Sequence, residues 1–236
     1  MSAGPGAATE LSPPAREALG RVLRLLADDR AAPTAVADPH RAWSVHVADS
    51  LSGLVVNELR EASTIADLGA GAGFPGLVLA VALPSAHVDL VESIGRKCEF
   101  IARAIAAAEI SNARVVCERS ESWAMSGPPS GGREVHQAVT ARAVGRLSTL
   151  AELASPLLVE GGVLVAWKGR RRPDEERELE RAASRLSMEP VEILSVGPYA
   201  GSRNRHLHVM RKSGRTPADL PRRPGLAKKR PFGSVS

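Results

Sequence analysis

The sequence predicts an α/β fold with a mainly parallel, seven-stranded sheet, helices on both of its faces and an N-terminal helical extension. Three observations lead to this prediction. From residue 64 onward, short apolar runs with the length of buried strands alternate with segments of helical periodicity. Such alternation is typical of parallel strands joined by crossover helices. A glycine-rich turn follows the first apolar run, at the place where open α/β sheets commonly bind a ligand.

Residues 1–60 are predicted to form the helical extension. Residues 14–29 carry apolar side chains at helical spacing, and residues 44–60 are expected to form a second helix. The apolar positions of the two segments are Leu19, Val22, Leu23, Leu26, Val47, Leu51, Leu54, Val55 and Leu59. Both segments precede the first strand, so we expect them to form a small cap beside the sheet.

The central domain is predicted to span residues 61–212, and residues 213–236 a basic C-terminal tail. Strands are expected at residues 64–68, 87–92, 113–117, 135–140 and 163–167. Helices are expected at residues 77–83, 96–108, 147–158 and 174–186. A closing pair of strands is expected at 191–196 and 206–211, the second being the candidate for an antiparallel strand because it follows a tight loop that contains glycine.

Composition narrows the class of protein. The chain has 236 residues, 44% of them hydrophobic, which suits one globular domain with an extension. It has no apolar run of about 18 residues, so no membrane-spanning helix is expected. The N-terminal residues lack a secretory pattern. The two cysteines, Cys98 and Cys117, do not make a disulfide framework, and no spacing suggests a metal site. A reducing cytoplasm is therefore the expected location.

The net charge of +5 is unevenly distributed. Between Arg211 and the end of the chain lie eight Lys or Arg residues and one Asp, so this segment carries +7 and the rest of the chain −2. Such a tail commonly meets a polyanion such as RNA. The alternative is a solvated tail that only aids solubility.

The sharpest functional signal is the turn at residues 67–76, which reads DLGAGAGFPG. Its alternate glycines, Gly69, Gly71 and Gly73, let the backbone bend and let a ligand approach closely. Asp67 ends the first strand and can accept a hydrogen bond from an ammonium group. Glu92 ends the second strand and can hold both hydroxyls of a ribose. These groups favour S-adenosyl-L-methionine, which carries an ammonium and a ribose, as the cofactor.

A nicotinamide cofactor is the main alternative, and it would make the protein an NAD-dependent oxidoreductase. It would share Glu92, but it would also need helix N–H groups for its pyrophosphate. Pro75 has no N–H to donate, and Asp67 would repel a phosphate. The methyl donor is therefore favoured, since it carries no phosphate. No Ser/His/Asp or Cys/His arrangement is recognisable in the sequence.

Arginine and lysine residues follow the predicted fourth and fifth strands, at the edge of the sheet where ligands bind. Arg142 could hold a cofactor carboxylate, a phosphate or a guanine O6 atom; alternatively it is a surface arginine paired with a helix acid. A second basic cluster and the tail could contact RNA phosphates. The candidate RNA-binding residues are Lys168, Arg170, Arg171, Arg172, Arg222, Arg223, Lys228, Lys229 and Arg230.

Several motifs in the order found here resemble the RsmG (GidB) family, bacterial methyltransferases that modify a guanine N7 in the RNA of the small ribosomal subunit. The resemblance extends from about Trp43 to Phe232. The motifs are WSVHVADSL at 43–51, the turn at 67–76 with its Phe-Pro-Gly ending, VES at 91–93 followed by Arg96, Lys97 and Phe100, TARAV at 140–144, WKG at 167–169 and PRRPGLAKKRP at 221–231.

The resemblance implies a Rossmann-like class I methyltransferase fold, S-adenosyl-L-methionine as cofactor, and transfer to N7 of a guanine of the 527 type in 16S ribosomal RNA. It implies cofactor contacts at Gly69 and Phe74, an adenine-side contact at Ser120 and Glu121, and a site role for Arg142. The usual Ser or Thr before that arginine is Ala141 here. The expected partner is 16S ribosomal RNA or the small subunit, with no membrane, and the protein is expected to be a monomer.

Two further alternatives stay open at this point. One is a methyltransferase that acts on another RNA or on a small molecule, and the other is an RNA-binding protein without activity. Guanine N7 is a neutral lone-pair donor, so its methylation needs no base. Catalysis then consists mainly of positioning, which agrees with the missing dyad.

Overall fold

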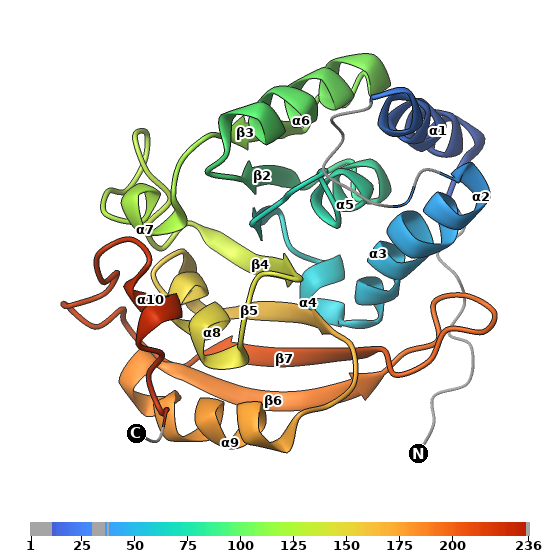
Figure 1. Ribbon diagram of the computed structural model, residues 1–236. Helices are drawn as coiled ribbons and strands as arrows, with labels where there is room; N and C mark the ends of the chain where they lie inside the picture. Colours follow the sequence, from blue (N-terminus) through green and yellow to red (C-terminus); the bar gives the residue numbers. More distant parts are fainter. Residues whose placement is uncertain (1–10, 30–35, 37, 235–236) are drawn as a thin grey trace.

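The computed structural model describes residues 11–29, 36 and 38–234. A single mixed sheet forms the centre of the molecule, with helices packed on both faces (Figure 1). One face is covered by the N-terminal helices together with α5 (Gly76–Ala82) and α6 (Gly95–Ala108). The other is covered by α8 (Leu147–Ala154) and α9 (Pro173–Ala182). The N-terminal helices therefore share a core with the sheet, and the domain boundaries at residues 60 and 212 stay predictions.

The sheet confirms the predicted α/β class. Its strand order is β3-β2-β1-β4-β5-β7-β6, and all strands run parallel except β7, which is antiparallel to both neighbours. The strands are β1 (Thr64–Leu68), β2 (His87–Val91), β3 (Ala113–Val116), β4 (His136–Arg142), β5 (Leu158–Lys168), β6 (Met188–Ser195) and β7 (His206–Lys212). The order reverses between β1 and β4, so the carboxyl ends of these two strands flank the crevice where such sheets bind ligands.

The remaining helices are α1 (Pro13–Asp28), α2 (Pro39–Ala42), α3 (Asp49–Leu51), α4 (Asn57–Arg60), α7 (Ser120–Trp123) and α10 (Leu226–Lys229), with 3₁₀ turns at Ser52–Val55 and Ser184–Leu186. Among all the helices of the described ranges, none is long and apolar enough to cross a membrane.

The second predicted helix, at residues 44–60, was wrong as a single element. A π-helical turn occupies Trp43–Ala48, and the extended backbone at Val56 separates the run from α4. Within the run, a Cβ added to Gly53 would come 2.1 Å from Cζ2 of Trp167 on β5. The backbone at Gly53 therefore packs directly against this indole. π turns of this kind often occur at functional sites.

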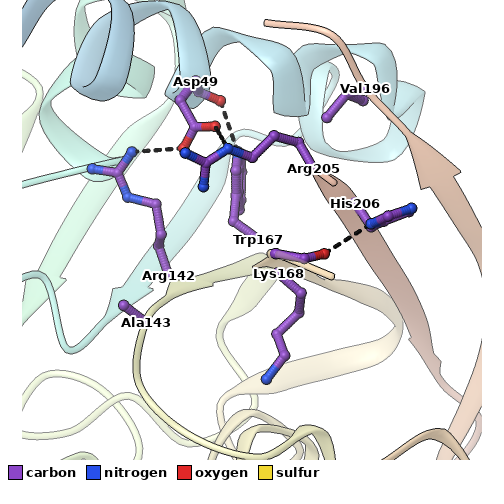
Figure 2. Close-up of a pocket in the computed structure, with 9 residues that line it drawn as sticks. Asp49, Arg142, Ala143, Trp167, Lys168, Val196, Arg205 and His206 are labelled. Carbon is purple, nitrogen blue, oxygen red and sulfur yellow. Dashed lines mark hydrogen bonds and ion pairs between the residues drawn. The ribbon is translucent and has the colours of Figure 1, made fainter. Parts of the chain in front are cut away.

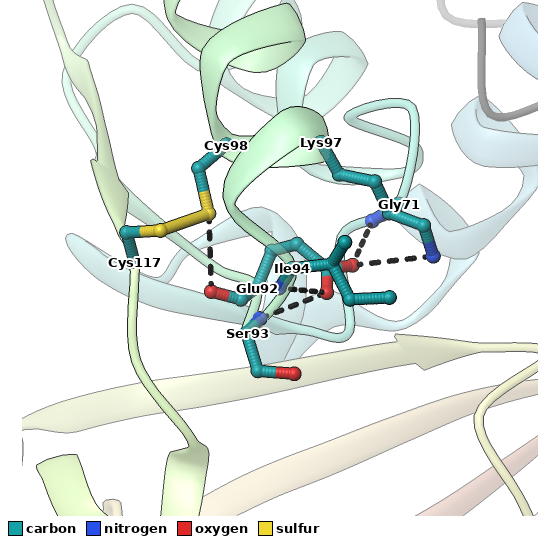
Figure 3. Close-up of a disulfide and its surroundings, with 7 residues drawn as sticks. All are labelled: Gly71, Glu92, Ser93, Ile94, Lys97, Cys98 and Cys117. Carbon is teal, nitrogen blue, oxygen red and sulfur yellow. Dashed lines mark hydrogen bonds and ion pairs between the residues drawn. A yellow bond between two sulfur atoms is a disulfide. The ribbon is translucent and has the colours of Figure 1, made fainter. Parts of the chain in front are cut away.

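Cys98 and Cys117 are joined by a disulfide (Figure 3), which the spacing of the two cysteines did not predict. Cys98 lies in the first turn of α6, and Cys117 follows β3 directly. Because β2 and β3 are parallel neighbours with Val91 opposite Val116, the residue after β3 meets the helix that follows β2. The resulting Cα–Cα distance is 5.8 Å, within the range that a disulfide requires.

Candidate functional site

The turn between β1 and α5 has a backbone that only glycine adopts easily. The φ angles of Gly69, Gly71 and Gly73 are +65°, +62° and +90°. The N–H groups of Gly69 and Ala70 both donate to the carbonyl of Val91, at 2.9 and 3.1 Å. Added Cβ atoms would also lie 2.8 Å from Val144 Cγ2 at Gly69 and 2.4 Å from Leu77 Cδ1 at Gly73. The predicted glycine turn is therefore confirmed as a tight structure against the end of β2.

The side chain of Asp67, near the end of β1, stabilises this turn through hydrogen bonds. Its side chain is fully buried, with Oδ2 accepting from the Gly76 N–H at 2.8 Å and Oδ1 from the Thr140 hydroxyl at 2.9 Å. Burial raises the pKa of this carboxyl to about 6, although the two hydrogen bonds oppose the shift. Both oxygens face protein groups, so the geometry assigns Asp67 to positioning the turn and lends no support to the expected contact with an ammonium group.

Glu92, directly after β2, also contacts the glycine turn, at Gly71 (Figure 3). Oε1 accepts from the backbone N–H groups of Ser93 at 2.8 Å and Ile94 at 3.0 Å. Oε2 accepts from the Gly71 N–H at 3.1 Å and lies 3.8 Å from Nζ of Lys97. A carboxylate oxygen can accept two hydrogen bonds, so Oε2 keeps one acceptor position for a hydroxyl.

A cleft of about 350 Å³ opens beside Gly69 and Glu92. The ends of β1 and β2 contribute apolar side chains and Glu92, and the start of α7 contributes Ser120 and Glu121. The residues around it are Leu68, Gly69, Val91, Glu92, Ser93, Ile94, Glu118, Arg119, Ser120, Glu121, Val144, Thr149, Leu153, Gly225, Ala227 and Lys228. The cleft thus contains four of the nine predicted cofactor residues, Gly69, Glu92, Ser120 and Glu121. Three further lining residues, Gly225, Ala227 and Lys228, come from the C-terminal tail.

The tail is a wall of this cleft. Oε1 of Glu121 accepts from the Gly225 N–H at 2.7 Å, and the Thr149 hydroxyl donates to the Ala227 carbonyl at 3.2 Å. The residue predicted to contact adenine therefore anchors the segment that was predicted to reach RNA. Both contacts join sites far apart in the sequence, so no local pattern could have indicated them.

Arg222, one of the predicted RNA-binding residues, packs against other parts of the protein. Its guanidinium donates to both oxygens of Glu152 at 2.6 and 2.5 Å and to the Arg230 carbonyl at 2.8 Å. It also lies 3.8 Å from the centroid of the Phe232 ring. These partners fix Arg222 against α8, and its expected contact with RNA stays a prediction. The side chains of Arg223, Lys228, Lys229 and Arg230 are exposed.

The cluster after β5 is largely balanced by acids of α9. The ion pairs are Lys168–Glu175 at 2.8 Å, Arg171–Glu176 at 2.7 Å and Arg172–Asp174 at 3.3 Å. Arg170 has no ion pair with any residue that the structure describes. The segment that follows β5 thus carries less free positive charge than its composition suggests.

A second pocket, of about 220 Å³, lies at the ends of β4 and β5 (Figure 2). Its lining residues are Asp49, Arg142, Ala143, Trp167, Lys168, Gly169, Val196, Arg205 and His206. Arg142 is confirmed as a residue of this edge. Its Nη1 donates to Asp49 Oδ2 at 3.0 Å and to the Val45 carbonyl at 3.2 Å. Arg142 therefore pairs with a helix acid, as the surface alternative expected, but both members of this pair line a pocket.

The side chains of Phe74 and His46 pack next to Arg142. Their rings are stacked with centroids 4.6 Å apart and planes 12° apart, and the Arg142 guanidinium lies 5.8 Å from the Phe74 centroid. Burial, and secondarily the charge of Arg142, lowers the pKa of His46 to about 4, so the imidazole is neutral at pH 7. Phe74 is only 5% exposed and contacts these side chains, while its expected cofactor contact stays a prediction.

Sequence reasoning missed Asp49 and Arg205 as site residues. The available signal is that His46 and Asp49 are three residues apart in the motif at 43–51, a spacing that places both on one face of a helix. Arg205 precedes β7 within a loop, and nothing in its neighbourhood distinguishes it. Both reach the pocket only because the π turn and β7 meet at the same edge.

A parallel sheet with one antiparallel strand, a glycine turn after β1 and an acidic residue directly after β2 together define an S-adenosylmethionine-dependent methyltransferase. The chain belongs to the GidB family, rRNA small subunit methyltransferase G, whose family profile matches residues 24–207.

Similar proteins support this assignment. Ribosomal RNA small subunit methyltransferase G of Pelotomaculum thermopropionicum is 37% identical over 200 residues, which cover 84% of this chain and 82% of that protein. The protein of the same name from Bacillus subtilis is 32% identical over 199 residues, with 84% and 82% covered.

Solved structures share the fold. Methanococcus jannaschii fibrillarin, a pre-rRNA processing protein, has a TM-score of 0.55 at 18% identity, covering 71% of this chain and 74% of that one. Aeropyrum pernix fibrillarin with natively bound S-adenosyl-L-methionine has a TM-score of 0.52 at 15% identity, covering 69% and 72%. At these identities the likeness concerns the fold alone.

Proposed function

We propose that this protein transfers the methyl group of S-adenosyl-L-methionine to N7 of a guanine of the 527 type in 16S ribosomal RNA. One observation carries the proposal: consecutive residues line the two pockets at the carboxyl edge of the sheet. Ala143 lines the pocket of Arg142, and the next residue, Val144, lines the cleft of Glu92. A cofactor and a base bound in these two spaces would lie side by side.

The cleft residues fit the cofactor. Oε2 of Glu92 has an acceptor position for a ribose hydroxyl, and the Cβ-free turn at Gly69 and Gly71 permits close approach of the methionyl part. The apolar walls at Val144 and Leu153 suit the adenine, with Ser120 as a polar group at its edge. Bound there, the cofactor supplies a methyl group already activated by a positively charged sulfur.

The chain's own contribution to the reaction is alignment. Guanine N7 carries no proton at pH 7, so the site needs no base, and the neutral His46 is turned toward Phe74 and Arg142. Arg142, fixed by Asp49 and the Val45 carbonyl, presents a rigid guanidinium at the boundary between the two pockets. We assign it the catalytic role of orienting the base or the cofactor carboxylate in line with the reacting atoms.

RNA phosphates are then held mainly by the exposed cations of the tail and by Arg170. Lys228 lines the cofactor cleft, and Arg223, Lys229 and Arg230 belong to the same tail segment. An RNA bound by them would approach the site from the side of the tail. Such contacts make binding strongly dependent on salt. We also propose that the protein acts as a monomer in the cytoplasm, where its substrate, the small ribosomal subunit or its RNA, is available.

The test is transfer from radiolabelled S-adenosyl-L-methionine to unmethylated small subunits and to their purified RNA, mapped by strand cleavage specific for N7-methylguanine. We expect a single cleaved guanine in one of the two substrates. Labelling at another atom, or at many positions, would contradict the proposal, as would cofactor binding without any transfer to either substrate.

A further inference from the structure

Two buried polar atoms in the pocket of Arg142 lack hydrogen-bond partners. Asp49 Oδ1 and Arg205 Nε are both inaccessible to solvent, and neither has a hydrogen-bond partner among the described residues. They form a long ion pair with each other at 3.9 Å, which is beyond hydrogen-bond distance and leaves the hydrogen-bonding capacity of both atoms unused. Buried polar atoms are rarely left unsatisfied, so two such atoms in one pocket point to a position that binds a polar ligand.

The carboxylate of Asp49 is held in place from two sides. Its Oδ2 accepts from Arg142 at 3.0 Å, and its backbone carbonyl accepts from Nε1 of Trp167 at 2.8 Å. Its residue exposure is 4%. Figure 2 shows Asp49 between Arg142 and Arg205, with Oδ1 turned toward the latter. The oxygen that remains is therefore a preorganised acceptor whose direction is fixed by these two contacts.

Arg205 is the matching donor, and it is the more exposed of the two. Its Nη2 donates to the Tyr199 hydroxyl at 3.0 Å, and its side chain is 37% exposed. A planar group can therefore enter between the two side chains by displacing this guanidinium outward. The pocket of about 220 Å³ is smaller than the roughly 300–1,000 Å³ of whole-ligand sites, which suits one base.

The donor and acceptor pattern of this pair matches guanine. Arg205 offers only donors and Asp49 only acceptors. The Watson–Crick edge of guanine presents the O6 acceptor next to the N1–H and 2-amino donors, whereas adenine has an acceptor at N1. Guanine held by this edge keeps its N7 free to receive the methyl group. We propose that Asp49 and Arg205 read the Watson–Crick edge of the target guanine and so set the base specificity of the site.

This inference rests on the proposed function and is tested within it. Unmethylated small subunits are reconstituted with RNA that carries guanine or inosine at the methylated position. Inosine lacks only the 2-amino group and keeps N7. Because a site built to bind a polar group discriminates against analogues that lack it, we expect kcat/KM for guanine to exceed that for inosine by at least about tenfold. This comparison uses the wild-type protein and does not depend on the folding of any variant.

The variant Asp49→Asn tests the role of the Asp49 carboxylate directly. Arg142 holds the amide oxygen, so the amide N–H₂ takes the place of Oδ1 and meets the guanine donors. Transfer to guanine is expected to fall by at least about thirtyfold and the ratio of guanine to inosine to approach one, with the Kd for S-adenosyl-L-methionine unchanged within about twofold. The control is Glu189→Gln, an exposed carboxylate on β6, which should behave as wild type.

The outcomes separate the two proposals. Equal wild-type transfer to guanine and inosine overturns this inference and leaves the proposed function standing. A wild-type ratio retained by Asp49→Asn also overturns it, because Asp49 then acts only through Arg142. If the wild-type protein methylates neither reconstituted subunit, the proposed function fails and the inference fails with it.

Discussion

The carboxylate of Glu121 accepts a hydrogen bond of 2.7 Å from the backbone N–H of Gly225, which joins the loop after β3 to the C-terminal tail. Together with the Thr149–Ala227 contact, this bond makes the tail part of the cofactor cleft. A basic tail that only bound RNA would leave cofactor affinity untouched, so the two roles can be separated by experiment.

Deletion of residues 224–236, which keeps Arg222 and its pair with Glu152, is expected to weaken S-adenosyl-L-methionine binding at least about tenfold, equivalent to about 1.4 kcal/mol, because the cleft loses one wall. Isothermal titration calorimetry of the truncated and full-length proteins measures the difference. Replacement of the exposed Arg223 and Lys229 by alanine serves as the control and should leave the Kd unchanged. An unchanged Kd in the truncated protein would return the tail to a role in RNA binding alone.

Arg222 and Arg223 are neighbours with opposite expected behaviour. Arg222→Ala leaves the buried Glu152 (2% exposed) without its partner and is expected to lower the free energy of unfolding by about 3–5 kcal/mol. Arg223→Ala should change stability by less than about 0.5 kcal/mol but lower the salt dependence of RNA binding by about one charge. Urea unfolding and RNA titrations at several salt concentrations test the pair. Equal effects of the two substitutions on both measurements would contradict the assignment.

Arg142 is expected to be needed for transfer as well as for neutralising Asp49. Arg142→Ala should lower kcat by about a hundredfold, because positioning is lost, and should also destabilise the fold by leaving Asp49 unpaired. The double variant Arg142→Ala/Asp49→Ala should recover much of the lost stability and none of the activity. Thermal unfolding and single-turnover transfer measure the two quantities. Recovery of activity in the double variant would reduce Arg142 to a partner of Asp49.

The raised pKa of Asp67 predicts a stability that falls as pH rises. The carboxyl has a pKa of about 6 in the folded protein, against 3.8 for an unperturbed aspartate. Between these values the folded state binds more protons than the unfolded state, so the contribution of Asp67 is largest below about pH 4 and is lost by about pH 6 to 7. The lost amount is roughly 3 kcal/mol.

Asp67→Asn removes this titration while keeping a polar group of the same size. The unfolding free energy of the wild type minus that of the variant should therefore fall by most of this amount, about 2.4 kcal/mol, from pH 4 to pH 7. Chemical denaturation at the two pH values measures it, and the difference cancels the contributions of other titrating groups. A constant difference would show that the pKa of Asp67 is close to its ordinary value.

Much of the fold follows from local patterns. The strands were recognisable because buried runs such as Thr64–Leu68 are largely apolar apart from Asp67, and the glycine turn because three positive φ angles require glycine. Glu92 was placed correctly by its distance along the chain from that turn. These features depend on neighbours in the sequence, so the sequence alone could indicate them.

The features that local patterns did not indicate involve contacts between distant segments. Gly53 packs against Trp167, and Arg222 is held by Glu152 and Phe232. The disulfide depends on the alignment of β2 with β3. In the same way, the charges after β5 could not be discounted until α9 was seen to bring its carboxylates back onto them. Composition reports how many charges a segment has, whereas only the structure shows which of them are neutralised.

Consecutive residues line the two pockets, Ala143 on one side and Val144 on the other, and Ala143 has a φ of +60°. A displacement of this segment would alter both spaces, so we expect occupancy of one pocket to change the free energy of binding in the other. Such linkage is reciprocal: if RNA binds more weakly beside the demethylated cofactor than beside S-adenosyl-L-methionine by some factor, RNA must weaken the demethylated cofactor relative to S-adenosyl-L-methionine by the same factor. Release of the two products would then be coupled.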